Sequence, residues 1–93
     1  MSYYMKAAKA AKDGNINTFS QLMALGILND ADNGCTMSFL AKSLGISGAS
    51  MTMMADKFEE IGVAKRAAEP HDRRAFRLKI TAKGRDTFNQ ILP

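Results

Sequence analysis

The strongest constraint on the fold lies between Thr36 and Gly62, where the boundary signals of two helices stand a short turn apart. Thr36 is placed to cap a first helix, and Gly45 is placed to end it. Ser47 is placed to cap a second helix, which Gly62 then ends. Two compact helices joined by a short glycine-containing turn are the helix-turn-helix pattern, which we predict at about 37–61.

The apolar residues of this segment recur at helical spacing, so each helix has one face that is suited to burial. In the first helix this face is formed by Met37, Leu40, Ala41 and Leu44. In the second helix it is formed by Met51, Met54, Ala55 and Phe58. Methionine at such positions is far more often a packing residue than a metal or redox ligand, so we assign Met51 and Met54 to the core.

The residues that follow predict a β-hairpin. Residues 63–66 form a short strand candidate, and residues 67–74 are predicted to be a polar loop, in which Pro70 opposes helix and sheet alike. Apolar and basic residues then alternate in a second predicted strand: Phe76, Arg77, Leu78, Lys79 and Ile80. Thr81 is placed to cap a last helix. With a hairpin at about 63–80, the order predicts a winged helix-turn-helix, mainly α with a small β-hairpin wing.

Two further helices are predicted upstream of this unit. Residues 2–12 are rich in alanine and lysine, which are good helix formers. A capping box that starts at Thr18 precedes a predicted helix over 19–29, and residues 30–34 are predicted to form a turn. A chain of 93 residues has room for one domain. We therefore expect residues 1–93 to fold as a single domain with flanking terminal helices.

Positive charge is concentrated in one stretch of the chain. The formal net charge is +4, and residues 64–79 alone hold six Lys and Arg against two acidic residues. The remainder of the chain is therefore neutral overall. A focused positive patch on a neutral body favours a polyanionic partner, of which nucleic acid is the simplest. The alternative is a solvated face with uneven charge, and structural context has to decide between the two.

The composition argues against several other classes of protein. No apolar run is long enough to span a bilayer and no signal-peptide core is present, so we expect a cytoplasmic protein with no membrane partner. Cys35, the single cysteine, agrees with a reducing compartment and leaves a thiol switch as a minor alternative. One cysteine and one histidine, His71, provide neither a nucleophile–base pair nor a set of metal ligands. We therefore expect no enzyme activity, no catalytic residue, no metal and no cofactor.

Five motifs follow one another over about residues 36–88: LAKSLGIS, S-x-x-S-M-T, DKFEEIGVAKR, EPHDRR and LKITAKGRD. Together they resemble the MarR family of bacterial winged-helix transcription regulators. The third motif stands in place of the family's leucine-rich helix end, and the last two resemble its D-x-R wing and its L-T-x-x-G signature. Family members usually run half again as long, with long N- and C-terminal helices that build a dimer. Met53 stands where the family often has a basic side chain.

The wing carries the most specific candidate residues. The resemblance implies that Arg74 enters the minor groove of DNA and that Asp72, two residues away, braces it. Two physical properties favour such an insertion. A narrow A·T-rich minor groove concentrates negative potential, and a guanidinium is weakly hydrated and so loses little by leaving water. Arg73, Arg77 and Lys65 are candidates for phosphate contacts. In the alternative interpretation, Asp72 and Arg74 form an ion pair that stabilises the hairpin, and the other cations belong to a solvated strand.

The second helix of the helix-turn-helix is the candidate recognition helix. Ala49 and Met53 lie opposite its buried face, and we expect them to meet thymine methyl groups in the major groove. Short hydroxyl groups and one lysine complete the candidate DNA-binding set: Ser47, Ser50, Thr52 and Lys57. Local capping is the alternative role of the hydroxyl groups, and it accounts for Ser47. Asp56 and Glu60 would repel phosphates, so only the N-terminal half of the helix is expected to enter the groove.

The function that follows is that of a sequence-specific double-stranded DNA-binding transcriptional regulator, acting as a repressor that occludes a promoter. The alternative is a winged-helix adaptor that docks on polymerase or on another regulator. A homodimer through the N- and C-terminal helices is also expected, because apolar residues gather at both ends: Tyr3, Tyr4, Met5, Phe88, Ile91 and Leu92. Such a protein would be bacterial or phage-encoded and associated with the nucleoid. The residues leave open whether a small-molecule effector binds.

Overall fold

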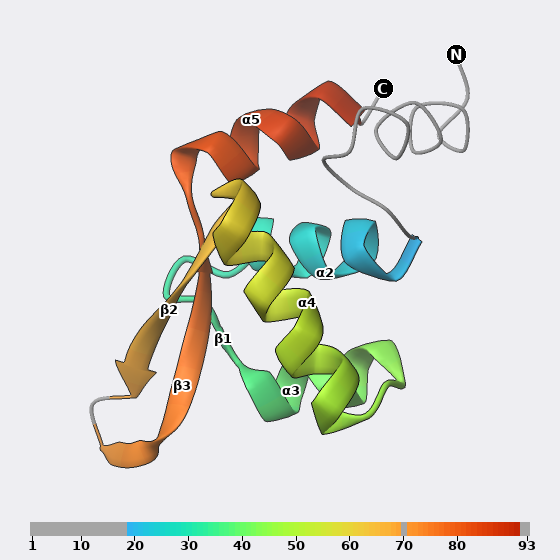
Figure 1. Ribbon diagram of the computed structural model, residues 1–93. Helices are drawn as coiled ribbons and strands as arrows, with labels where there is room; N and C mark the ends of the chain where they lie inside the picture. The colour runs from blue at the N-terminus through green and yellow to red at the C-terminus, as the bar shows by residue number, and fades with distance from the viewer. Residues whose placement is uncertain (1–18, 70, 92–93) are drawn as a thin grey trace.

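The computed structural model describes residues 19–69 and 71–91, except for the side chains of residues 72–75 and 91. In chain order its elements are α2 (Phe19–Asn29), β1 (Cys35–Thr36), α3 (Met37–Leu44), α4 (Gly48–Ile61), β2 (Ala64–Glu69), β3 (Asp72–Ile80) and α5 (Ala82–Ile91). The helices form one body, from which the β2–β3 hairpin extends (Figure 1). Over the described residues this is the predicted winged helix-turn-helix, mainly α with a small sheet.

The predicted caps define the helix-turn-helix. The Oγ1 atom of Thr36 accepts a hydrogen bond from the backbone N–H of Phe39 at 3.1 Å and so caps α3. The C-terminal ends of α3 and α4 lie at Gly45 and Gly62, whose φ angles of 67° and 80° fall in the left-handed region that glycine adopts without strain. Ser47 caps α4 in the same way as Thr36 caps α3. The predicted boundaries of 37–61 are therefore confirmed.

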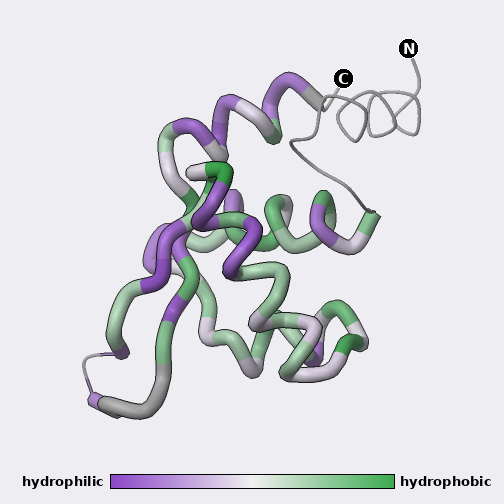
Figure 2. Tube along the Cα trace, viewed as in Figure 1, coloured by the Kyte–Doolittle hydropathy of each residue, from purple (hydrophilic) through white to green (hydrophobic). Residues whose placement is uncertain are grey.

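The hydrophobic core joins α2 to α4. Leu22, Leu25 and Leu28 of α2 are completely buried, and Met51 and Phe58 of α4 belong to the same cluster. Burial of a side chain of this size contributes about 1.5–3 kcal/mol relative to exposure. Figure 2 shows that α2 consists mostly of hydrophobic residues, whereas α5 is mostly hydrophilic. The predicted helix over 19–29 and the predicted inward face of α4 are both confirmed.

A short strand, β1, adds a third member to the sheet of the described residues. The strands are antiparallel in the order β1-β3-β2, and β1 pairs Cys35 with Leu78 and Thr36 with Arg77. The sequence prediction missed this strand, because two residues are too few to display an alternating pattern. Its partner strand also lies about forty residues further along the chain, beyond the reach of local signals.

The hairpin corrects the predicted loop. We predicted a strand over 63–66 and a loop over 67–74, but β2 continues to Glu69 and β3 already begins at Asp72. Pairing across the hairpin continues at Ala68 with Phe76, and the register shifts between Ala68 and Glu69. The polar composition suggested a loop, whereas backbone pairing with the opposite strand overrides that local preference. The wing is therefore built of longer strands than the sequence indicated.

The hydroxyl group of Thr81 connects the start of α5 to the end of α4. Thr81 donates a hydrogen bond from its hydroxyl group to the carbonyl oxygen of Gly62 at 2.6 Å. Its Oγ1 atom also accepts the backbone N–H of Gly84 at 3.0 Å, which confirms the predicted cap. The predicted helix over 2–12 and the capping residue Thr18 lie outside the described residues.

The close approach at Gly84 predicts the effect of adding a methyl group. In Gly84→Ala, the new Cβ would overlap the carbonyl oxygen of Val63 and lie 2.6 Å from Cγ1 of Ile80. We expect the free energy of unfolding to fall by about 2 kcal/mol, although alanine is favoured over glycine within a helix by about 1 kcal/mol. Urea unfolding followed by circular dichroism measures the change.

Gly48→Ala is the matched control, since a Cβ at Gly48 meets nothing within 4 Å. We expect its free energy of unfolding to stay within about 0.5 kcal/mol of the wild-type value. Equal stabilities of the two variants would contradict the close packing of Gly84 against Val63.

Candidate nucleic-acid interface

The outer face of α4 presents apolar and acidic side chains to solvent. Ala49, Asp56 and Glu60 are exposed, and Met53 keeps 72% of its surface accessible. These residues lie opposite the buried face of α4, as the spacing predicted. A largely exposed methionine in the first half of a helix offers a flexible apolar contact for a partner.

Three residues with short hydroxyl side chains lie at the N-terminus of α4, and all of them are exposed: Ser47, Ser50 and Thr52. Ser47 accepts the backbone N–H of Ser50 at 3.1 Å and donates its own hydroxyl to Oγ of Ser50 at 3.1 Å. Thr52 donates to the carbonyl oxygen of Gly48 at 3.0 Å. The capping role expected for Ser47 is therefore present. Lys57 is partly buried further along the helix.

The basic residues of the hairpin differ in what they contact. Lys65 of β2 is exposed, whereas Arg77 of β3 is partly buried. Nε of Arg77 donates to Oε2 of Glu69 at 2.6 Å, and its Nη1 donates to the carbonyl oxygen of Gly34 at 3.3 Å. Arg77, which the sequence predicted to contact phosphate, therefore donates to two acceptors within the protein. The sequence did not indicate either of these contacts.

Three wing candidates lie at the start of β3. The backbone of Asp72, Arg73 and Arg74 belongs to this strand, directly after the turn. Their side chains lie outside the described residues. The predicted brace between Asp72 and Arg74 therefore stays a prediction.

Arg66 connects the hairpin to α4 through contacts that the sequence prediction missed. Its Nη2 donates to Oδ1 of Asp56 at 2.8 Å, and its Nη1 donates to Oε1 of Glu59. Its backbone N–H donates to Oε2 of Glu59 at 3.1 Å. Hydrogen bonds from the backbone and the guanidinium of Arg66 lower the pKa of Glu59. The only sequence signal was the spacing of Asp56 and Glu59 on one face of a helix that a basic strand follows.

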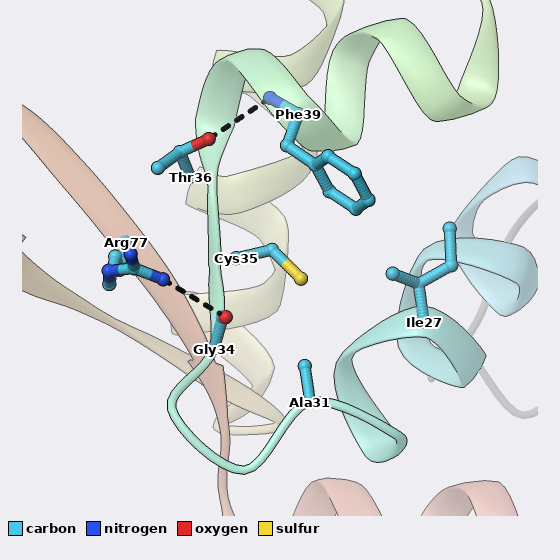
Figure 3. A pocket seen from close by; sticks show the side chains of 7 residues that line it. All are labelled: Ile27, Ala31, Gly34, Cys35, Thr36, Phe39 and Arg77. Carbon is cyan, nitrogen blue, oxygen red and sulfur yellow. Dashed lines mark hydrogen bonds between the residues drawn. The ribbon is translucent and has the colours of Figure 1, made fainter.

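A pocket of about 490 Å³ opens beside α2, β1 and the start of α3. It is lined by Ile27, Ala31, Gly34, Cys35, Thr36, Phe39 and Arg77 (Figure 3). The thiol of Cys35 points from β1 towards the α2 side of this space (Figure 3). Burial raises the pKa of the Cys35 thiol, and the nearby charge of Arg77 opposes that shift. Cys35 lies in β1, the two-residue strand between the turn that follows α2 and the start of α3.

Neither a metal site nor a membrane-spanning helix is found in the part of the chain that the structure describes. No group of three or more His, Cys, Asp or Glu side chains in this part of the chain could hold a metal ion. None of the helices described is both long enough and apolar enough to cross a membrane.

The sequence is similar to known transcription regulators. The profile of the MarR family matches residues 18–75. The chain is 35% identical over 72 residues to the transcriptional repressor MprA of Escherichia coli (strain K12), a match that covers 76% of this chain and 41% of MprA. The chain thus spans about two fifths of the length of the curated relatives it matches. The resemblance inferred from the five motifs is confirmed.

Solved structures share the fold. MepR of S. aureus, in a complex with DNA, matches with a TM-score of 0.84 at 23% sequence identity, over 92% of this chain and 69% of MepR. RV1404 from Mycobacterium tuberculosis matches with a TM-score of 0.80 at 28% identity, over 95% of this chain and 59% of RV1404. These matches confirm the winged-helix fold that the sequence predicted.

The burial of Cys35 predicts a slow reaction of its thiol in the folded protein. Since only the thiolate is nucleophilic, a raised pKa leaves less reactive thiol at a given pH. With an aromatic disulfide reagent at pH 8, we expect the folded protein to react about tenfold more slowly than the same protein in urea. The folded rate should keep rising at pH values where the unfolded thiol is already ionised. Equal rates for the folded and unfolded protein would contradict this account.

Proposed function

Since the chain belongs to the MarR family, we propose that it is a sequence-specific double-stranded DNA-binding transcriptional regulator that acts as a repressor. The observation that carries this proposal is the exposed N-terminal half of α4, capped at Ser47 and held by a helix-turn-helix beside a basic hairpin. Repression is supported by the name of the curated relative, a transcriptional repressor. The MarR family consists of transcriptional regulators and not of enzymes, in agreement with the expectation of no catalytic activity.

We propose that α4 lies in the major groove. Ala49 and Met53 would contact thymine methyl groups, since both are apolar and exposed. The remaining candidates on this helix would bind phosphates or base edges: Ser47, Ser50, Thr52 and Lys57. The exposure of the three hydroxyl groups supports this role. Ser50 accepts from Ser47 and keeps its own O–H donor for DNA. The hydroxyls of Ser47 and Thr52 already donate within the protein and keep acceptor capacity for base edges.

We propose that the hairpin lies along the neighbouring minor groove. Arg74 would enter the groove with Asp72 bracing it, and the position of both at the start of β3, beside the turn, supports this role. Arg73 and Lys65 would contact phosphates. Arg77 belongs to the same proposed set, although Glu69 and Gly34 occupy two of its donor groups.

A homodimer is part of the proposal, with residues 1–93 as its single-domain subunit. Phe88 is partly buried and packs against Gly26 of α2, so its own chain already covers part of the proposed apolar seam. The other proposed seam residues lie outside the described side chains: Tyr3, Tyr4, Met5, Ile91 and Leu92. Met23 of α2, which is 43% exposed beside Phe88, supports an apolar contact on this side of the molecule. Such a dimer would act on nucleoid DNA in the cytoplasm.

Two wing variants test the proposed function. The wild-type protein should bind labelled duplex DNA with an affinity that falls as salt rises. Arg74→Ala should weaken binding to A·T-flanked sites more than to G·C-flanked sites, because the minor groove is narrower in the former. Arg73→Ala is the matched control and should weaken binding to all sequences alike, with a salt slope lower by about one. Fluorescence anisotropy at two salt concentrations measures both effects.

Two results would contradict this proposal. Equal, sequence-independent losses from the two variants would exclude minor-groove insertion by Arg74. No binding of the wild-type protein to duplex DNA would overturn the function itself and favour the adaptor.

The oligomeric state is tested by sedimentation across a wide range of protein concentrations. We expect a weak homodimer that tightens on palindromic duplex DNA, with recognition helices about 34 Å apart. Two half-sites give a small domain the specificity that one recognition helix lacks. A strict monomer that binds DNA one-to-one would overturn the proposed dimer.

A further inference from the structure

We propose that Arg66 is a positioning residue of the DNA-binding surface, an inference that rests on the function proposed above. Its guanidinium holds Asp56 and Glu59 of α4 against β2. In this role Arg66 fixes the recognition helix relative to the wing and balances carboxylate charge that would otherwise repel DNA phosphates. Arg66 acts through these two carboxylates and not by contact with DNA.

The contacts of Arg66 run along one face of α4. Thr52, Asp56 and Glu59 follow one another at i, i+4 and i+7, and so share this face. Besides its bonds to the two carboxylates, Nη2 of Arg66 lies 3.4 Å from the carbonyl oxygen of Thr52. The planar fork of a guanidinium can serve several acceptors at once, whereas a lysine ammonium is a point charge. Arg66 therefore holds two turns of the recognition helix, which a lysine could not do equally well.

The burial of the three side chains shows where the charge of Arg66 is directed. The Arg66 side chain is 24% exposed, whereas the side chains of Asp56 and Glu59 are 65% and 36% exposed. A hydrogen bond to Asp56 raises the pKa of Arg66, and bonds to Glu59 add to the shift. The arginine thus lies beneath more exposed carboxylates and directs its donors at them. Both Nη atoms of Arg66 are engaged with acceptors on α4 in this arrangement.

The position of Arg66 in the sheet connects the helix to the wing. Arg66 pairs with Leu78 of β3, so its backbone belongs to the same ladder as the hairpin. β2 also packs directly on α4 (Figure 1). Thr81 joins the two elements only at the C-terminal end of α4, through the carbonyl oxygen of Gly62. Because α4 and the wing are proposed to enter neighbouring grooves together, an error of about 1 Å between them weakens both contacts.

Asp56 is the partner carboxylate of Arg66 that lies nearer to the N-terminal half of α4. This residue follows Met53 by one turn on the exposed side of α4, close to the half that is proposed to enter the groove. Without Arg66, two carboxylates would face the phosphates without compensation. Repulsion between exposed charges weakens as salt rises, so the cost of losing Arg66 depends on ionic strength.

A double-mutant cycle tests the inference. Arg66→Met is prepared in the wild-type chain and in a chain that carries Asp56→Asn and Glu59→Gln. Dissociation constants for one labelled duplex are measured at low and at moderate salt, and circular dichroism and thermal melting check the fold of each variant. In the wild-type chain we expect Arg66→Met to weaken binding about tenfold at low salt, and less at higher salt. In the amide background the same substitution should cost about twofold or less, because no carboxylate is left to balance.

Arg66→Lys keeps the charge and serves as the second variant if Arg66→Met does not fold. Its affinity for DNA should lie between those of the wild-type protein and Arg66→Met. In the chain that carries Asp56→Asn and Glu59→Gln, Arg66→Lys should bind nearly as well as Arg66 does. An equal loss from Arg66→Met in both backgrounds, with a salt slope lower by about one, would overturn the inference and make Arg66 a phosphate contact. A loss that did not change with salt would reduce Arg66 to a packing role. Failure of the wild-type chain to bind duplex DNA would instead overturn the proposed function.

Discussion

Burial of one face of α4 is the constraint on which the proposed interface depends. Met51 and Phe58 are almost completely removed from solvent, and Ala55 between them is fully buried. Since side chains leave a helix in fixed directions, burying this face turns Ala49 and Met53 to the outside. A rotation of α4 about its axis would expose Phe58 and bury polar residues, which the core disfavours. The packing of the core thus selects the residues that α4 offers to DNA.

The proposed interface also requires that α4 keep a fixed position relative to the hairpin. Polar contacts between the two elements maintain this position. An exposed ion pair adds only about 0–1 kcal/mol to stability, so the pairs made by Arg66 have little weight as a source of folding energy. Their consequence is geometric, because the carboxylates of Asp56 and Glu59 can bond one guanidinium only while β2 lies beside α4. Thr81 and Lys83 add to this at the end of the helix by donating to the carbonyl oxygens of Gly62 and Ile61. Hydrophobic burial determines the fold, and these contacts align the two DNA-facing elements.

The limits of prediction from this sequence follow the range of the interactions. The caps at Thr36, Ser47 and Thr81 are local, so the boundaries of α3 and α4 and the start of α5 could be predicted from the residues nearby. Strand β1 depends on pairing with residues about forty positions further along the chain, and it was missed. The outer parts of the hairpin pair with residues close in the sequence, and they were predicted too short because their polar composition suggested a loop. The contacts of Arg66 arise only once α4 has packed against β2. Those of Arg77 arise only once β3 lies beside β2 and β1. The spacing of side chains therefore predicted which face of α4 is exposed but not which of its charges are balanced.

The most direct test of the central claim is a nuclear magnetic resonance titration of the backbone amides with duplex DNA. If α4 and the hairpin form the interface, the largest shift changes should fall on residues 47–53 and 64–80, with little change along α2. The changes should weaken as salt is added, since phosphate contacts release counterions. Shift changes confined to α2 and α5, around Met23 and Phe88, would contradict the account and assign the partner to the opposite side of the fold.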